Sequence, residues 1–254
     1  MRDRSDADWE ELARKEPYFA VLTDERFLSG SLSPDRLLEF FASGEDDVEH
    51  LFDLVAAYLG APIAPRNALD FGCGAGRLTL ALARRAAHVV GVDAAPTMLQ
   101  VAEQHRAAAS ADNVELVPDL DSLSKRDFDF ICSLIVFQHI AVERGELLLR
   151  KLLDLMRPGG VIAVHFVFDR RGGVVKHMAR RLRASFPLLH RAVQALNREP
   201  LRLPYMQMNS YDRGRILALM EEGGCRKPSL TPTDHGGIGG AIVIAVKEPA
   251  GGRA

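Results

Sequence analysis

Apolar side chains recur at intervals of three and four residues in the first part of the chain, which is the spacing of one helix face. Two runs carry this pattern, Leu37 to Phe41 and Val48 to Val55. Gly60 and a following pair of prolines then interrupt it. The pattern predicts a helical section over residues 1–60.

Beyond this section, short apolar runs alternate with helical stretches, which favours a mostly parallel sheet wound by helices on both faces. The predicted strands are Ala68–Phe71, His88–Val92, Val114–Val117, Phe128–Leu134, Val161–Phe168, Ser229–Thr233 and Ala241–Lys247. The predicted helices among them are Arg77–Ala86, Pro96–Arg106, Glu143–Met156 and Asp212–Glu222. Pro158, Gly159 and Gly160 are expected to end the helix before them and to turn the chain into the fifth strand. The fold class is therefore α/β.

Composition narrows the class of protein. The 254 residues are 47% hydrophobic and 26% charged, as in a globular domain. The sequence has no run near the roughly 20 apolar residues that cross a bilayer, and it begins with charges instead of an apolar signal core. Three cysteines without metal-like spacing argue against a disulfide framework or a zinc site. We expect a cytoplasmic protein without a bound metal.

The net charge of −2 conceals two opposite excesses. Residues 1–60 hold fifteen acids against six Lys and Arg, whereas residues 170–202 hold nine Lys and Arg against one acid. Apolar positions at nearly helical spacing predict a basic helical insertion over residues 170–210, after the fifth strand. Its arginines either face water and the acidic section, or recognise an anionic substrate, or contact an anionic lipid surface.

A glycine-rich turn links the first predicted strand to its helix. It reads Asp70-Phe71-Gly72-Cys73-Gly74-Ala75-Gly76, at the edge of the sheet where ligands bind and where glycines let the backbone approach a nucleotide. Asp93 ends the next strand about 20 residues further on, where an acid can accept both ribose hydroxyls of an adenosine. Each feature alone is compatible with a tight turn or a solvated loop. Together they indicate an adenosine ligand.

The spacing of the glycines distinguishes between the possible adenosine-containing ligands. Arg77 stands where a dinucleotide site has its third glycine, and no Gly-Lys-Ser/Thr follows for a triphosphate loop. The remaining pattern, Asp-x-Gly-x-Gly-x-Gly, resembles that of the class I S-adenosylmethionine-dependent methyltransferases. The likeness covers residues 67–168 in order, including Val92–Leu99, Val114–Leu120, Phe128–Ile140 and Leu155–Gly160. It implies a seven-stranded sheet whose last strand is antiparallel beside the fifth.

The resemblance also implies the cofactor, S-adenosyl-L-methionine, which leaves as S-adenosyl-L-homocysteine. Asp93 would hold its ribose, Ala94 and Met98 would flank its adenine, and Asp119 would accept the adenine amino group beside Leu120. Ala94 and Ala95 depart from the family, which usually has a small polar residue after the ribose acid. The implied cofactor residues are Asp70, Phe71, Gly72, Cys73, Gly74, Gly76, Asp93, Ala94, Met98, Asp119, Leu120 and Ser133.

Methyl transfer from a sulfonium is an in-line displacement, so alignment of the two reactants supplies much of the acceleration. A base is needed only for a protonated nucleophile, and it must lie at the carboxyl edge of the sheet. His139, after the fourth strand, and His235, between the last two strands beside Asp234, are the candidates. His139 could instead be a hydrogen-bonded residue that closes its loop. Asp129 begins a strand and is expected to be structural.

These observations predict a methyltransferase that acts on an oxygen or nitrogen atom of a small molecule, anionic acceptors included. The alternatives are an RNA methyltransferase and a catalytically silent regulator or subunit that binds S-adenosylmethionine. Nucleic acid is not favoured, because a chain with a pI near 6.5 lacks a broad basic face. The expected organisation is a cover over 1–60, a core over 61–169 and 211–248, and the insertion over 170–210.

Overall fold

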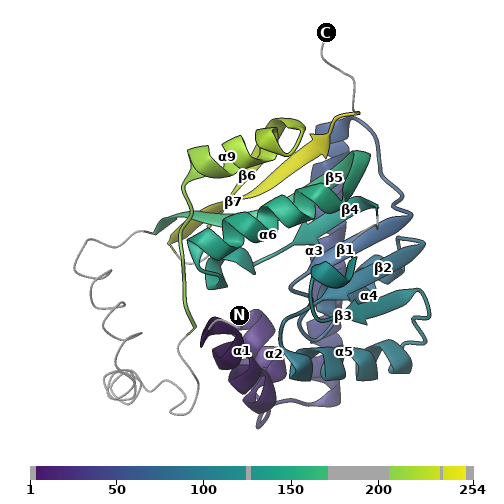
Figure 1. Cartoon of the computed structure of the whole chain (residues 1–254). Coiled ribbons are helices and arrows are strands. Elements are labelled where there is room, and N and C mark those ends of the chain that lie inside the picture. The colour runs from purple at the N-terminus through teal and green to yellow at the C-terminus, as the bar shows by residue number, and fades with distance from the viewer. Residues whose placement is uncertain (1–3, 124–126, 171–205, 235–236, 250–254) are drawn as a thin grey trace.

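The computed structural model describes residues 4–123, 127–170, 206–234 and 237–249 (Figure 1). One seven-stranded sheet runs through it in the order β3-β2-β1-β4-β5-β7-β6. The strands are β1 Asn67–Phe71, β2 His88–Val92, β3 Val114–Val117, β4 Phe128–Ser133, β5 Met156–Arg170, β6 Cys225–Asp234 and β7 Ile238–Lys247. The first five are parallel, and β7 runs antiparallel between β5 and β6. The predicted fold class is confirmed, with the last strand antiparallel beside the fifth.

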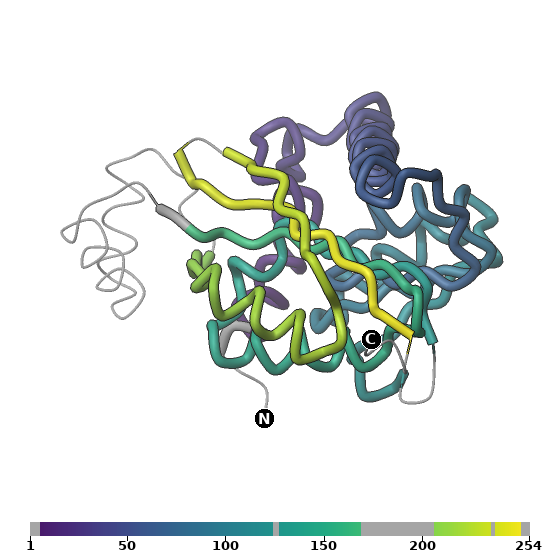
Figure 2. The backbone as a smooth tube through the Cα atoms, turned by 90° about the horizontal axis from the view of Figure 1, so that it is seen from above, coloured from purple at the N-terminus to yellow at the C-terminus, as the bar shows by residue number. Residues whose placement is uncertain are grey.

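Helices cover both faces of this sheet, as Figure 2 shows for α3 and α9. These helices are α3 Pro34–Leu59, which precedes β1, and α4 Arg77–Ala83, α5 Pro96–Ala108, α6 Val142–Leu155 and α9 Arg213–Glu222, which follow strands. Val48 of α3 packs with Ala68 and Phe130 on one face. On the other face, Leu149 of α6 packs with Leu69. Because neighbouring residues of β1 point to opposite faces, both faces need apolar residues, which explains the continuous apolar strands.

The join between α6 and β5 differs from the expectation. α6 ends at Leu155, and β5 begins at the next residue, so Pro158, Gly159 and Gly160 lie inside the strand. The pairing with β4 shifts register between Phe128 and Phe130, and Gly159 has a φ of 77°. A left-handed glycine permits such an irregularity within a strand. The prediction that this triplet turns the chain between two elements is therefore wrong.

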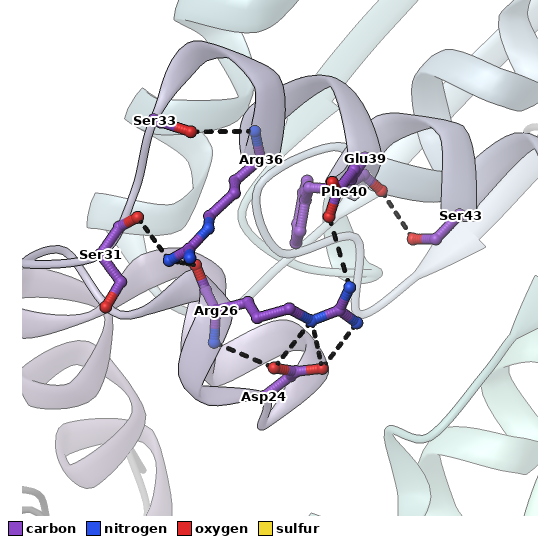
Figure 3. Close-up of polar contacts among 8 residues, drawn as sticks. All are labelled: Asp24, Arg26, Ser31, Ser33, Arg36, Glu39, Phe40 and Ser43. Carbon is purple, nitrogen blue, oxygen red and sulfur yellow. Dashed lines mark hydrogen bonds and ion pairs between the residues drawn. The ribbon is translucent and has the colours of Figure 1, made fainter.

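The predicted N-terminal helices are present as α1 Arg4–Lys15, α2 Pro17–Leu22, the short η1 Glu25–Phe27 and α3. Arg26 of η1 forms ion pairs with Asp24 at 2.8 Å and with Glu39 of α3 at 3.3 Å (Figure 3). Ser33 accepts from the Arg36 amide at 3.3 Å and caps α3 (Figure 3). These contacts fix η1 and the long helix as one unit.

The division of the chain into a cover, a core and an insertion stays a prediction, because residues 171–205 of the insertion lie outside the described residues. Within the described ranges, no helix combines the length and the apolarity that a membrane crossing requires.

Candidate functional site

Backbone hydrogen bonds hold the glycine-rich turn in place. β1 ends at Phe71, and the chain enters α4 after Gly76, its N-cap. Gly72, Gly74 and Gly76 have φ values of 80°, 52° and 86°, a region in which a β-carbon is costly. The amides of Gly72 and Cys73 donate to the carbonyl oxygen of Val92 at 2.8 and 3.0 Å. The loop after β1 is thus fastened to the end of β2.

Asp93 completes this connection. Its Oδ2 accepts from the Gly74 amide at 2.9 Å, and its Oδ1 accepts from the Ala95 amide at 2.9 Å. Burial raises the pKa of this carboxyl, the two amide donors oppose that rise, and the nearby charges of Asp6 and Glu10 add to it. The side chain keeps intermediate exposure to solvent. The two motifs of the sequence therefore meet at one point, through a direct hydrogen bond.

Asp70 lies deeper than the sequence suggests. It is 1% exposed, and its Oδ2 accepts from the Thr79 hydroxyl of α4 at 2.7 Å. Burial raises its pKa to about 6, against the opposing effect of the Thr79 hydroxyl. This carboxyl is bonded within the protein beneath the glycine loop, and its predicted role toward a ligand stays a prediction.

Of the other implied cofactor residues, some are exposed and the rest are buried. Ala94 is exposed beside Asp93, whereas Met98 and Leu120 are buried, at 4% and 5%. Asp119 is exposed and accepts from the amide and the hydroxyl of Ser122, both at 2.9 Å. The buried residues Phe71, Cys73 and Ser133 support the loop from below, and the Ser133 hydroxyl donates to the Phe71 carbonyl at 2.8 Å. The structure thus brings together Gly72, Gly74 and Asp93, with Ser133 bonded to Phe71 at the base of the same loop, whereas Asp119 bonds to Ser122.

His139 lies at the carboxyl edge of β4, in the short helix η3 Phe137–His139. Its Nδ1 is 2.7 Å from the Gln207 carbonyl oxygen, and its Nε2 is 3.2 Å from the Gln138 side-chain nitrogen. A carbonyl oxygen can only accept, so Nδ1 donates and Nε2 accepts from the amide of Gln138. Burial lowers the pKa to about 4, against the effect of the Gln207 carbonyl. The ring is therefore neutral near pH 7, and the Trp9 ring lies edge-on to it at 4.8 Å.

The residues that fix the His139 loop were not found from the sequence. Asn209 Nδ2 donates to the carbonyl oxygens of Gln138 and Ile140 at 3.2 and 3.0 Å. The buried Tyr211 donates its hydroxyl to the Phe137 carbonyl at 3.0 Å. These pairings span about seventy residues of sequence, and no local motif marks such long-range partners. His139 thus has the hydrogen-bonded, loop-closing geometry that was the alternative to a base.

The second candidate base, His235, lies outside the described residues. Its neighbour Asp234 is exposed, and its Oδ1 accepts from the Gly237 amide at 2.6 Å. Asp129, expected to be structural, accepts from the amides of Arg66 and Asn67 at 2.9 Å each, at the start of β1. That structural role is confirmed.

The sequence predicted a helical cover over residues 1–60, but it did not indicate which residue of α1 contacts this edge of the sheet. Glu10 of α1 accepts from the Thr97 amide at 3.0 Å and from the Thr97 hydroxyl at 2.7 Å. The acidic excess of the first residues pointed to this section as a whole, but it could not distinguish Glu10 from the neighbouring acids. Among the residues that the structure describes, no group of three His, Cys, Asp or Glu side chains is arranged to hold a metal ion.

Comparisons with known proteins agree with this geometry. Residues 68–160 match the family described as a methyltransferase domain. A ubiquinone biosynthesis O-methyltransferase of Xanthomonas campestris pv. campestris is 33% identical over 113 residues, which are 43% of this chain and 46% of that protein. The chain thus spans about half the length of the curated relatives it matches.

Solved structures extend the likeness to the fold of nearly the whole chain. The magnesium protoporphyrin IX methyltransferase of Synechocystis PCC 6803, solved with S-adenosylhomocysteine, has a TM-score of 0.60 at 18% identity, over 94% of this chain and 100% of that one. The N-methyltransferase NodS of Bradyrhizobium japonicum, also solved with that product, has a TM-score of 0.56 at 13% identity, over 95% and 99%.

Proposed function

We propose that this chain, whose residues 68–160 form a methyltransferase domain within a class I S-adenosylmethionine-dependent methyltransferase fold, methylates an oxygen atom of a small molecule. The observation that carries the proposal is the hydrogen bond from the Gly74 amide to Asp93. It joins the glycine loop to the acid at the point of the sheet where a nucleoside cofactor binds in such folds.

The residues at this point fit the implied cofactor. The three left-handed glycines add no side chain to the loop, which is packed closely enough that a β-carbon on Gly72 would overlap with Val136. Asp93 has used one lone pair of each oxygen on an amide, so each oxygen can still accept a ribose hydroxyl. Met98 and Leu120, both buried, would flank the adenine, as the resemblance to the family implies. Bound S-adenosylmethionine would supply an electrophilic methyl carbon.

The chain's own contribution is mainly to hold the acceptor in line with that carbon. His139, with a neutral ring and a pKa of about 4, is a weak base near pH 7. We therefore expect that His139→Gln lowers turnover by less than about 100-fold, the lower limit for an efficient general base. His235 stays the second proposed base.

Two considerations support an oxygen atom of a small molecule as the acceptor. Curated relatives that match part of this chain, from Xanthomonas campestris and Chelativorans, are named ubiquinone biosynthesis O-methyltransferases. In addition, α1 and α2 lie over the carboxyl edge, where Leu12 and Ala20 pack with Met98. A covered edge suits a small acceptor better than an extended polymer.

A methyl-transfer screen tests the activity. The chain would be incubated with a metabolite extract and S-adenosylmethionine carrying a labelled methyl group, and the labelled products would be separated and identified. The proposal predicts label in a small organic acceptor, released by conditions that cleave methyl ethers or esters. Label in RNA alone, or in no acceptor at all while the cofactor still binds, would contradict it.

A further inference from the structure

Helix α5 begins directly after the proposed ribose acid and lacks a cap of its own. Its N-cap residue is Ala95, which has no side chain to accept from the free amides of the first turn, and Pro96 follows. The N-cap side chain therefore accepts from none of the first-turn amides of α5, although the Leu99 amide donates to the Ala95 carbonyl at 3.2 Å. An uncapped first turn is less stable than a capped one.

Glu10 of α1 provides the missing cap from another element. Its two carboxylate oxygens accept from the amide and the hydroxyl of Thr97, at 3.0 and 2.7 Å. Burial opposes ionisation of Glu10, but the hydrogen bonds of Thr97, assisted by Arg14, outweigh it and lower the pKa. A carboxylate at this position also complements the positive end of the α5 dipole.

Two further contacts fix α1 in this position. Asp6 forms an ion pair with Arg144 of α6 at 2.6 Å, so the helix is anchored on α6 as well as on α5. Leu12 and Ala13 are each 1% exposed and pack with Ala95 and Met98. Figure 1 shows α1 and α2 together beside α5 and below α6.

The backbone around the proposed ribose acid is thereby held from two directions. The glycine loop donates to Asp93 Oδ2, the Ala95 amide donates to Oδ1, and Glu10 holds the next turn through Thr97. We propose that Glu10 is a positioning residue for Asp93, so that the affinity for the cofactor depends on the seating of α1. This inference rests on the proposed function.

The coupling must act in both directions. If a seated α1 strengthens cofactor binding by some factor, bound cofactor strengthens the seating of α1 by the same factor. S-adenosylmethionine should therefore slow hydrogen exchange in the peptide over residues 4–15. The slowing should be lost in a variant that lacks the Glu10 carboxylate.

Calorimetric titration of S-adenosylmethionine into Glu10 variants tests the role. Glu10→Ala removes the cap and should weaken binding about fivefold, which is the scale of one lost helix cap. Glu10→Gln keeps one acceptor and should recover part of this loss. In an Asp93→Asn background, Glu10→Ala should weaken binding by a much smaller factor, because the two residues act on the same contact.

Glu11 supplies the matched control. It lies on the same helix and pairs with Lys15 at 2.5 Å, just as Glu10 pairs with Arg14 at 3.0 Å, but it is 55% exposed. Glu11→Ala and Glu11→Gln should leave the affinity unchanged. Circular dichroism and urea unfolding would establish that every variant is folded at the titration temperature.

The outcomes separate the two proposals. A wild-type chain that binds no S-adenosylmethionine overturns the proposed function. In a second outcome, the wild-type chain binds S-adenosylmethionine but no better than Glu10→Ala does, and hydrogen exchange over α1 is unchanged by the cofactor. That result overturns the role of Glu10 alone. Equal weakening by the Glu10 and Glu11 variants would likewise assign the effect to helix stability and contradict the positioning role.

Discussion

Replacement of Gly72 by alanine tests the geometry of the glycine loop most sharply. The residue has a φ of 80°, and an added β-carbon would lie 2.4 and 2.6 Å from the two methyl carbons of Val136. The left-handed backbone costs an alanine about 1 to 2 kcal/mol. The overlap adds about 1 to 3 kcal/mol, as insertion of a methyl group into a packed site does. Gly72→Ala should therefore lower the free energy of unfolding by about 2 to 5 kcal/mol.

Urea unfolding followed by circular dichroism measures this change. Two further variants separate the cost of the left-handed backbone from the cost of the overlap with Val136. Gly60 has a φ of 75° with no atom within 4 Å of an added β-carbon, so Gly60→Ala should show the backbone cost alone. In a Val136→Ala background, where the two methyl carbons are absent, Gly72→Ala should cost about 1 to 3 kcal/mol less than in the wild type. Equal costs in both backgrounds would refute the predicted contact between Gly72 and Val136.

Other predictions concern titration and buried hydroxyls. Folding lowers the pKa of His139 from 6.5 to about 4, so its contribution to stability should fall by up to about 3 kcal/mol as the pH drops through that range. His139→Gln should thus lose less stability than the wild type between pH 7 and pH 4.5 in urea titrations. Asp70 has the opposite sign, since folding raises its pKa from 3.8 to about 6, and Asp70→Asn should remove a stability gain on acidification over that interval. Ser133→Ala removes the donor to the Phe71 carbonyl and should lower the unfolding free energy by about 1 to 2 kcal/mol, whereas an unchanged urea midpoint would contradict that bond.

The sequence predicted the central strands well because both of their faces are buried. The bounds of β2 and β3 coincide with the predicted runs, since an apolar run then ends where the strand ends. The join between α6 and β5 was missed because the Pro158 to Gly160 triplet is compatible with a turn and with an irregular strand. Only the pairing with β4 distinguishes the two.

The candidate site was predictable as far as local motifs reach. The glycine turn and Asp93 each follow a strand of a parallel sheet, so their meeting follows from topology. His139 bonds to Gln207, and Thr97 bonds to Glu10. Both partners are distant in sequence and belong to no motif. Their contacts depend on how α1 and the segment after the insertion pack, and the periodicity of a helix does not specify the surface that it covers.

Calorimetric titration of S-adenosylmethionine into the wild-type chain and into Asp93→Ala tests the central claim most directly. We predict saturable one-site binding to the wild type, together with a higher melting temperature in the presence of the ligand. Asp93→Ala, which cannot accept the ribose hydroxyls, should bind much more weakly. No binding to the wild type at high micromolar ligand with an unchanged melting temperature, or equal affinity of the two proteins, would contradict the assignment of this site.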